Sequence, residues 1–575
     1  MWSELFINIA DSQIEKRPIP ESFKEFGGRS YVTNYLMALV MGGKMDPKCD
    51  PMGPQNPLIF CNGIFSGTAF STDHRLSVGG KSPLTGTIKE ASAGGTVAKY
   101  MADHGLRSVT VHGLPTDGKL KYIHILPDGS AVLEDAEEYR LMGNYAFGDA
   151  MRAKYGKNVA IASIGPAGER LCKAASIQVT EFGEGYPSRA AARGGIGALM
   201  GVKGIKALVI EKAENVYKVE YANEELFKQS VAAINKLMHE KGSQSHYHKV
   251  GTISIIDGTA RNGILPVKNF GGKMMYDAPE KVGAVPFLAN NAQRGGCNGK
   301  PCQPGCVVQC SNVYNDKDGN YLTSGFEYET VALFGPNCMI TDLDQIARLD
   351  RMCDDIGLDT IEMGDAAAVA MESGKIEWGD GKAVEGLLNE VKEGTEFGLI
   401  MGNGCEAVGL ALGCEHIPVV KHQSLSGYDP RNSKGTGITY AKSPQGADHT
   451  AACTVGFTSF GDYPRDTALY VSNKLQVAIT FSDSMMCLFT FSQISSRLDL
   501  LLGMYVGLFG GEMDITRITI GLGVKVLLTE VKFNELAGFK TEDDRLPRFF
   551  YEEMHEGTGE VFDIGDIELD SVFRF

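Results

Sequence analysis

Four cysteines constrain the fold and the chemistry of this chain more than any other feature. Cys302, Cys306 and Cys310 lie in one short segment, Cys-Gln-Pro-Gly-Cys-Val-Val-Gln-Cys, and Cys487 lies far downstream. Three thiolates on a local loop can bind three corners of a cubane iron–sulfur cluster, and the fourth ligand then comes from another segment. The pattern therefore predicts a [4Fe-4S] cluster and a redox protein.

Two alternatives to the cluster stay open at the level of the sequence. A structural zinc site typically uses two Cys-x-x-Cys or Cys/His pairs, and the sequence does not contain them. Chance clustering is the other alternative, because the chain has 13 cysteines. The cluster is favoured because three of these cysteines share one regular spacing.

Length, charge and hydropathy limit the classes of protein to which the chain can belong. With 575 residues, of which 43% are hydrophobic, we expect two to four domains. A net charge of −16 argues against a nucleic-acid partner, because phosphate binding requires a positive surface. The sequence has neither a long apolar run nor a basic leader with a cleavage site, so we expect a cytoplasmic protein without a membrane anchor.

The first third of the chain alternates short apolar runs with Gly, Pro and Asp turns, which predicts a β-rich domain. The expected strands cover residues 57–60, 108–112, 122–126 and 207–210. After residue 211 the apolar residues recur three and four apart, which predicts a helix over 224–238. The clearest domain boundary is therefore near residue 212.

A second helix is expected from residue 341 onward. Thr341 is its predicted N-cap and Gly357 its predicted stop. The helix brings Asp354 and Asp359 to its C-terminal end. The apolar stripe of this helix consists of Ile346, Leu349, Cys353 and Ile356.

The predicted fold class is α+β, with a β-rich N-terminal domain followed by two mainly helical domains. The expected boundaries are residues 1–212, 213–418 and 419–575. The second domain carries the cysteine segment, and the third carries Cys487.

Three glycine-rich segments, 79–86, 93–95 and 189–201, punctuate the β-rich region. Glycine backbone next to arginine suits an anionic, phosphate-bearing ligand, because peptide N–H groups and guanidinium groups can both face its oxygens. None of the segments matches a Walker loop or a dinucleotide fingerprint. Taken singly, each is also compatible with ordinary turns.

Taken together and in order, these segments resemble the tungsten-containing aldehyde:ferredoxin oxidoreductase family. The resemblance spans nearly the whole chain. Besides the cysteine segment, Gly94 and Gly95, it rests on Asn56-Pro-Leu-Ile-Phe60, Lys81-Ser-Pro-Leu-Thr-Gly86, Ile164-Gly-Pro-Ala-Gly-Glu169, Arg193-Gly-Gly-Ile-Gly-Ala-Leu-Met-Gly201, Glu327-Tyr-Glu-Thr330, Asp354-Asp-Ile-Gly-Leu-Asp-Thr360, Gly446-Ala-Asp-His449 and Asp543-Asp-Arg-Leu-Pro547.

The resemblance implies a tungsten or molybdenum bis-pterin cofactor on a β base, covered by two helical domains and adjacent to a [4Fe-4S] cluster. It implies that Mg²⁺ bridges the pterin phosphates near the carbonyls of Ser92 and Gly194. The cluster ligands implied are Cys302, Cys306, Cys310 and Cys487. The residues implied around the pterins are Arg75, Ser92, Gly94, Gly95, Arg193, Gly194 and Gly195 at the phosphates, Asp354 and Asp359 at one pterin, and Asp483 and Leu488 at the other.

The resemblance also assigns Glu329 and His449 to an acid–base pair beside the metal. Independently, a buried glutamate can accept a proton, and an Asp-His step in a Gly-flanked loop can orient an aldehyde oxygen. Without the resemblance, His449 would be interpreted as a packed or capping histidine. If the segment around Glu329 is extended, Glu327 shares its face, but the resemblance gives Glu327 no proton to move.

The sequence departs from the family pattern around the proposed cofactors. The family usually has Cys-x-x-Cys-x-x-x-Cys, whereas here three residues fill both gaps and Cys297 lies just upstream. The choice of cluster ligands therefore includes the possibility that Cys297 replaces one of the four. Ser92 stands where asparagine is usual, and Asp483 is expected to substitute for the aspartate that the family has at position 482.

A further departure concerns the subunit interface. Some family members carry Glu-x-x-His for an iron shared between two subunits, and here the matching positions are Arg348 and Arg351. Cationic side chains do not ligate iron. We therefore expect that any homodimer lacks an intersubunit iron.

The expected function is oxidation of an aldehyde to a carboxylic acid, with electrons passed through the cluster to a ferredoxin-like acceptor or partner subunit. One alternative is a family member that reduces a different substrate, such as an aromatic thioester. Another is a non-catalytic iron–sulfur subunit that only transfers electrons.

Overall fold

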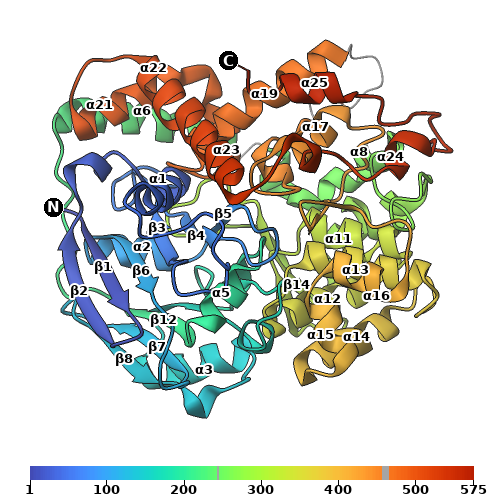
Figure 1. Cartoon of the computed structure of the whole chain (residues 1–575), viewed down its shortest axis with the longest axis horizontal. Coiled ribbons are helices and arrows are strands. Elements are labelled where there is room, and N and C mark those ends of the chain that lie inside the picture. The colour runs from blue at the N-terminus through green and yellow to red at the C-terminus, as the bar shows by residue number, and fades with distance from the viewer. Residues whose placement is uncertain (243–244, 456–464, 575) are drawn as a thin grey trace.

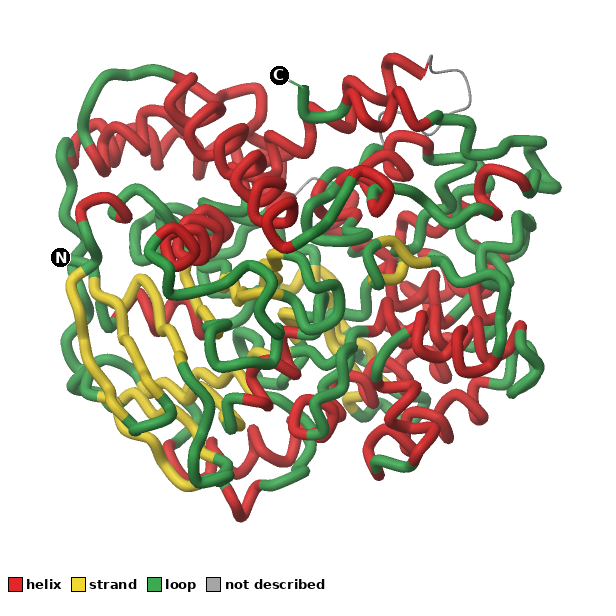
Figure 2. Tube along the Cα trace, in the orientation of Figure 1, coloured by secondary structure: helices red, strands yellow, loops and turns green. Residues whose placement is uncertain are grey.

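A computed structural model describes residues 1–242, 245–455 and 465–574 of the chain. The two large sheets lie within the first 211 residues, and the rest of the chain is mainly helical. In Figure 1 the sheets occupy the lower left, and helices form the right and the top. Figure 2 shows the same separation of strands from helices. The predicted α+β class is confirmed.

The first sheet has six strands in the order β2-β1-β6-β3-β4-β5. Strands β1 and β6 are parallel, and the other neighbours are antiparallel. The bounds are β1 Ser3–Asn8, β2 Gln13–Pro18, β3 Leu58–Asn62, β4 Leu76–Lys81, β5 Ile88–Ala93 and β6 Leu106–His112.

The second sheet has the order β11-β10-β9-β12-β7-β8, with β12 and β7 parallel. The bounds are β7 Lys121–Ile125, β8 Ala131–Asp135, β9 Val159–Ser163, β10 Ile177–Val179, β11 Arg189–Ala191 and β12 Ile205–Glu211. The helices of this region are α1 Gly28–Met41, α2 Val97–Asp103, α3 Asn144–Tyr155, α4 Pro166–Glu169 and α5 Ile196–Val202.

The two sheets share one hydrophobic core. Phe60 and Val109 of the first sheet and Ile123 and Leu208 of the second are fully buried in it. Strands covered on both faces form continuous apolar runs rather than alternating patterns, as in the fully buried strand Leu58–Asn62. The strands expected from the apolar runs are confirmed as β3, β6, β7 and β12.

The remaining chain contains two small sheets and most of the helices. The small sheets are β13 Cys297–Lys300 with β14 Ser311–Asn315 and β15 Tyr321–Ser324, and β16 Val419–Val420 with β17 Gln423–Ser424. The helices up to residue 412 are α6 Glu224–Gly242, α7 His246–Val250, α8 Ile255–Arg261, α9 Ala278–Val282, α10 Ala284–Arg294, α11 Tyr328–Phe334, α12 Leu343–Ile356, α13 Thr360–Glu372, α14 Gly381–Glu393, α15 Glu396–Gly402 and α16 Cys405–Leu412.

The C-terminal helices follow the second small sheet. They are α17 Lys434–Lys442, α19 Arg465–Ser482, α20 Leu488–Ile494, α21 Leu498–Phe509, α22 Ile515–Ile518, α23 Lys525–Ala537, α24 Phe549–Glu552 and α25 Asp566–Ser571. A π-helical turn, Thr519–Val524, joins α22 to α23. A 3₁₀ turn, His449–Ala451, lies between α17 and α19.

Helix α12 begins one residue later than the sequence predicted. Its N-cap is Asp342, whose carboxylate accepts the Asp344 N–H at 2.9 Å, so the prediction of Thr341 was wrong. A carboxylate at the N-cap satisfies a free backbone donor and faces the positive end of the helix dipole. The predicted end at Gly357 is confirmed, because this glycine adopts a left-handed conformation with φ of 78°.

The helical segments do not pack strictly in chain order. Helix α6 lies against α21, with Phe227 and Ile234 packed in one core with Leu501. The C-terminal residues Phe550 and Leu569 instead share a core with Leu333 of α11. The proposed domain boundaries at 212 and 418 stay predictions.

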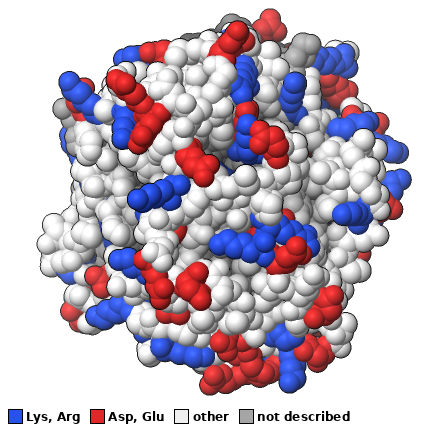
Figure 3. Space-filling view, turned by 90° about the vertical axis from the view of Figure 1, so that its left-hand side faces the viewer, with Lys and Arg blue, Asp and Glu red and all other residues white. Residues whose placement is uncertain are grey.

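The outer surface carries charges of both signs. The face shown in Figure 3 has Lys and Arg side chains next to Asp and Glu side chains. Within the described ranges, no helix is long and apolar enough to cross a membrane.

His416 joins the C-terminal segment to helix α13 through two ion pairs. Its Nδ1 lies 2.5 Å from Glu372 Oε1, and its Nε2 lies 2.8 Å from Glu553 Oε1. Burial opposes the charge on the ring, but the two carboxylates outweigh it and raise the pKa of His416. A neutral imidazole has one N–H, so both contacts are hydrogen bonds only when the ring is protonated.

We predict that His416→Ala lowers the melting temperature more in acid than in alkali. Because the folded-state pKa is raised, the stabilisation is complete below the unfolded-state pKa of about 6.5 and is lost as the pH rises through the folded-state value. Thermal unfolding of both proteins at about pH 6 and about pH 9 measures this. The exposed His246 supplies the control His246→Ala. An equal loss of melting temperature at both pH values in His416→Ala would contradict a stabilising role for the protonated ring.

Candidate functional site

The structure places the four predicted cysteines close enough for their thiols to interact electrostatically. Cys302 and Cys306 form a hydrogen bond, and the thiol of Cys310 interacts with both Cys302 and Cys487. The pKa of Cys302 is lowered to about 6, first by the hydrogen bond from Cys306 and then, against the cost of burial, by Arg189 and Arg75. These positive charges favour a thiolate at Cys302. The pKa values of the other three thiols are raised, that of Cys306 first by its hydrogen bond with Cys302 and those of Cys310 and Cys487 first by burial.

Cys487 reaches this group because it starts helix α20. It is the N-cap residue of that helix, and its N–H donates to the carbonyl of Thr72 at 3.4 Å. Arg75, three residues after Thr72, carries a positive charge that interacts with Cys487 and Cys302. A loop of the first sheet therefore holds the distant fourth cysteine next to the other three.

Gly94 and Gly95 let the cysteine segment approach the β-rich domain. A Cβ on Gly94 would lie 3.1 Å from Cys302 Sγ. Gly95, with φ of 102°, donates its N–H to the carbonyl of Cys302 at 3.0 Å. These two glycines therefore serve close backbone approach, which a side chain would prevent.

Cys297 lies outside the group. It is exposed at the start of β13, where it pairs with Val313 of β14. In the part of the chain that the structure describes, no three His, Cys, Asp or Glu side chains are arranged around a single metal ion. A cubane cluster differs from such an ion because each thiolate binds a separate iron atom.

The carbonyls predicted near Mg²⁺ make hydrogen bonds within the protein. Arg75 donates from Nη2 to the carbonyl of Ser92 at 3.1 Å and from Nε to its Oγ at 3.0 Å. The carbonyl of Gly194 accepts from Ser82 Oγ at 2.6 Å. The Gly194 carbonyl also accepts the Leu84 N–H at 3.4 Å, so both of its lone pairs already face protein donors.

Arg193 connects the glycine-rich segment to two helical regions. Its Nη1 donates to the Ala447 carbonyl at 3.1 Å, and its Nη2 donates to the Ser424 carbonyl at 2.6 Å. Its Nε lies 3.3 Å from Asp359 Oδ2. Asp359 also caps α13 by accepting the Ile361 N–H. Arg193 and Asp359 are therefore brought together, as the resemblance implies.

The other predicted carboxylates lie elsewhere. Asp354 accepts from the hydroxyl of Tyr145 at 3.4 Å. Asp483 lies 3.4 Å from Arg29 Nη1, and burial raises its pKa to about 8. Leu488 is the first residue of α20 and packs against the core of the C-terminal helices. Within the described ranges, no contact joins these residues to Arg193, so the structure does not bring them together with it.

Glu329 and His449 form a pair although they come from distant segments. Glu329 Oε1 lies 3.1 Å from His449 Nε2, and Glu329 Oε2 accepts the Gly427 N–H at 2.7 Å. The ring of Tyr428 lies 5.6 Å from the His449 ring. The contact is a close approach and not an aligned hydrogen bond, because Glu329 Oε1 is buried without a hydrogen-bond partner in the protein.

The expectation that Glu327 shares a face with Glu329 was wrong. Helix α11 begins at Tyr328, so Glu329 lies in the first helical turn and Glu327 is the extended N-cap residue. Glu327 instead accepts from Thr252 Oγ1 at 2.5 Å and lies 3.7 Å from Arg189 Nη1. It therefore belongs to the surroundings of the cysteines.

Sequence reasoning missed Lys89, which holds the turn that carries His449. Lys89 is fully buried, and its Nζ donates to Asp448 Oδ2 at 3.1 Å. Asp448 caps the 3₁₀ turn by accepting the Thr450 N–H at 3.0 Å. A Cβ on Gly194 would lie 2.6 Å from Lys89 Cγ. The available signal was a lysine inside a buried strand, which is rare unless the charge is paired.

Several buried polar atoms on the segments that form this interior have no hydrogen-bond partner in the protein. Buried polar groups are nearly always satisfied, so each such atom is open to a polar ligand. Arg189 Nε and Gln303 Nε2 are donors that suit an anionic cofactor, and the unpartnered glutamine oxygens are acceptors that suit donor groups on it. The atoms include Gln178 Oε1, Arg189 Nε, Gln303 Oε1 and Nε2, Gln423 Oε1 and His449 Nδ1.

Family models identify the class of protein. The N-terminal domain of aldehyde ferredoxin oxidoreductase matches residues 4–212, and domains 2 and 3 of aldehyde ferredoxin oxidoreductase match residues 229–572. The chain therefore belongs to the aldehyde ferredoxin oxidoreductase family and is an oxidoreductase enzyme. The family resemblance inferred from the motifs is confirmed.

Individual relatives agree with this assignment. Tungsten-containing aldehyde ferredoxin oxidoreductases of Pyrococcus furiosus and Thermococcus kodakarensis are each 30% identical to this chain, over 96% of its length and 91% and 92% of theirs. The WOR-like subunit of an aliphatic sulfonate oxidoreductase of Pyrococcus furiosus is 24% identical over 75% of this chain and 72% of that protein.

A solved structure shares the fold. The active site complex BamBC of benzoyl coenzyme A reductase, in complex with 1,5-dienoyl-CoA, superposes with a TM-score of 0.79. The match covers 99% of this chain and 93% of that chain at 17% sequence identity. At this identity, the match supports the fold and not the substrate.

We predict that Cys297→Ser retains the iron content and the EPR signal of the reduced protein, because Cys297 lies on an exposed strand outside the cysteine group. Cys302→Ser, its matched control, should lose iron, since Cys302 is at the centre of the group. Iron analysis and EPR measure both. Loss of iron in Cys297→Ser would show that the ligand set includes the upstream cysteine.

Proposed function

We propose that this protein is a tungsten (or molybdenum) bis-pterin oxidoreductase that oxidises an aldehyde to a carboxylic acid. The observation that carries the proposal is the Glu329–His449 pair, assembled from two distant segments next to the loop of Arg193. The tungsten-containing relatives support the choice of metal. The cofactor would pass its electrons through a [4Fe-4S] cluster to a ferredoxin-like acceptor or a partner subunit.

The residues that would hold the pterins come from the segments described above. Arg75, Ser92, Gly94, Gly95, Arg193, Gly194 and Gly195 would bind the phosphates, with Mg²⁺ between them. Asp359, held by Arg193, and Asp354 would face one pterin, and Asp483 and Leu488 would face the other. Cys302, Cys306, Cys310 and Cys487 would ligate the cluster. The unpartnered buried atoms and the positive charges of Arg75 and Arg193 support this arrangement.

The reaction balances as aldehyde plus water giving carboxylic acid, two protons and two electrons. When bound, the tungsten–pterin would supply a two-electron acceptor, and the cluster held by the four cysteines would supply one-electron transfer. Glu329 Oε1 would accept the proton of the attacking water. His449, held by the Asp448 cap and by Lys89, would donate a hydrogen bond to the aldehyde oxygen.

The free atoms of these two side chains support their proposed roles, because Glu329 Oε1 and His449 Nδ1 are buried and have no hydrogen-bond partner in the protein. Glu329 keeps one oxygen on the Gly427 N–H, which fixes the carboxylate and leaves Oε1 toward His449. His449 Nδ1 has no protein partner, so this nitrogen is available to a substrate. Tyr328 stacks on Tyr428 with ring centroids 5.0 Å apart, and Tyr428 in turn lies beside the His449 ring.

We predict that Glu329→Gln and His449→Ala each lower turnover about 10²- to 10⁴-fold, as expected when a general acid or base is removed. Tungsten, molybdenum and iron contents should be unchanged, because neither side chain is a proposed metal ligand. Steady-state assays with a panel of aldehydes and a viologen dye, together with elemental analysis, measure this.

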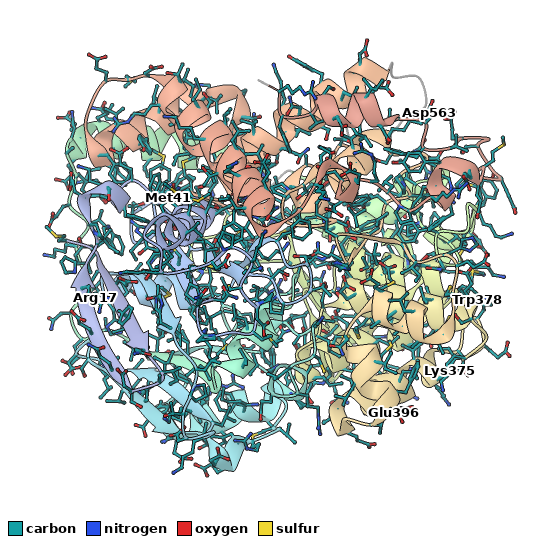
Figure 4. The ribbon with its side chains drawn as sticks, viewed as in Figure 1. Arg17, Met41, Lys375, Trp378, Glu396 and Asp563 are labelled. Atoms are coloured by element: carbon teal, nitrogen blue, oxygen red, sulfur yellow. The ribbon has the colours of Figure 1, made fainter. Side chains whose placement is uncertain are left out.

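Glu396→Gln is the control, because Glu396 is exposed on α15 (Figure 4). Wild-type turnover in both site variants would contradict the acid–base pair. Aldehyde turnover absent in the fully metallated wild type would favour reduction of another substrate, such as an aromatic thioester. Iron without tungsten or molybdenum would contradict the proposed cofactor.

A further inference from the structure

Arg189 occupies a fixed position between the cysteine segment and helix α11. Its Nη2 donates to Ser311 Oγ at 2.5 Å, and Ser311 directly follows Cys310. A Cβ on Gly325 would lie 2.5 Å from the same nitrogen, so the glycine leaves room for the guanidinium. The Arg189 side chain is only 10% exposed. Packing therefore holds this charge in place.

Two carboxylates lie near Arg189, and only one of them has a second cationic partner. Glu181 Oε2 lies 3.8 Å from Arg189 Nη2, but the other Glu181 oxygen accepts from Lys300 Nζ at 2.6 Å. Glu327 Oε1 lies 3.7 Å from Arg189 Nη1, and Thr252 donates to Glu327 Oε2. Lys300 therefore compensates Glu181. Arg189 and Glu327 remain as opposed charges at the cysteines, beside the further positive charge of Arg75.

Both charges act on the same thiols. The positive charge of Arg189 interacts with Cys302 and Cys310, and the negative charge of Glu327 interacts with the same two cysteines. The Nε of Arg189 is buried and has no hydrogen-bond partner in the protein. A buried donor of this kind is available to an acceptor that the protein itself does not supply, such as a cluster sulfur.

We propose that Arg189 and Glu327 are a pair of opposite charges that sets the reduction potential of the cluster bound by the four cysteines. One-electron reduction adds one negative charge to the cluster, which a nearby guanidinium stabilises and a nearby carboxylate destabilises. The interior is poorly screened by salt, so both effects persist at ordinary ionic strength. This inference rests on the proposed cluster but not on the identity of the aldehyde.

The test is an EPR-monitored redox titration of the holoenzyme, with dithionite as the electron donor and the cluster as the one-electron acceptor. Arg189→Gln removes the charge and keeps a donor for Ser311, so the equilibrium constant for reduction should fall about tenfold. For one electron, this is a shift of about 59 mV to lower potential. Glu327→Gln should shift the potential in the opposite direction, by less, because Glu327 is 31% exposed.

Two further variants separate charge from shape. Arg189→Lys keeps the charge and should stay near the wild-type potential, and the double variant Arg189→Gln/Glu327→Gln should return toward it. Arg348→Gln is the matched control, because Arg348 is a half-exposed cation paired with Glu385 on another helix. It should not change the potential.

Shifts of opposite sign in the two single variants, at unchanged iron content, would establish the proposal. Unchanged potentials, or shifts of the same sign, would overturn it. If Arg189→Gln does not assemble the cluster, Glu327→Gln decides the question alone, since a rise in potential is still required. Absence of iron from the wild type would contradict the proposed function instead, so the two failures are distinguishable.

Discussion

The burial of paired charges between the β-rich domain and the helices is the constraint on which the rest of the structure depends. Arg29 of α1 meets Glu530 of α23 through two hydrogen bonds of 2.7 and 2.9 Å, and Lys89 of β5 meets Asp448. All four of these side chains are nearly removed from solvent. An isolated buried charge is very costly, and removal of one partner from a buried pair costs about 3–5 kcal/mol. The helical segments must therefore pack on the β-rich domain in the one arrangement that brings both charge pairs together.

This closure directs two glutamates at the start of helix α11 toward two different proposed sites. Glu327 is extended and faces Arg189 at the cysteines, whereas Glu329 lies in the first turn of α11 and faces His449. The change from extended to helical backbone between them is what separates the two side chains. A shift of this helix start would move the proposed acid–base group and the proposed charge at the cluster together. The two sites are therefore linked by backbone geometry and not only by distance.

The sequence predicts the local elements better than the contacts between them. The apolar runs of β3 and β12 and the stripe of α12 follow from periodicity, because each element buries one face or both. The start of α12 was missed by one residue, since Thr341 and Asp342 are both good caps and only the carboxylate position decides between them. Lys89 was missed because its partner Asp448 is brought to it by the fold. No local pattern reports a partner from another segment.

The glycines show why this limit is physical. Gly94, Gly194 and Gly325 each lie where a Cβ would meet a side chain from another segment: Cys302, Lys89 and Arg189, respectively. In the sequence, the first two appear as parts of a phosphate-binding surface, and the third carries no signal of its own. In the fold, all three provide clearance for a thiol or a buried cation, so the same residue type serves close approach to protein and to ligand. Glycines therefore leave the room that these charges and thiols occupy. The glycine-rich segments mark the region of the site in the sequence, but only the packed structure shows which side chain each glycine accommodates.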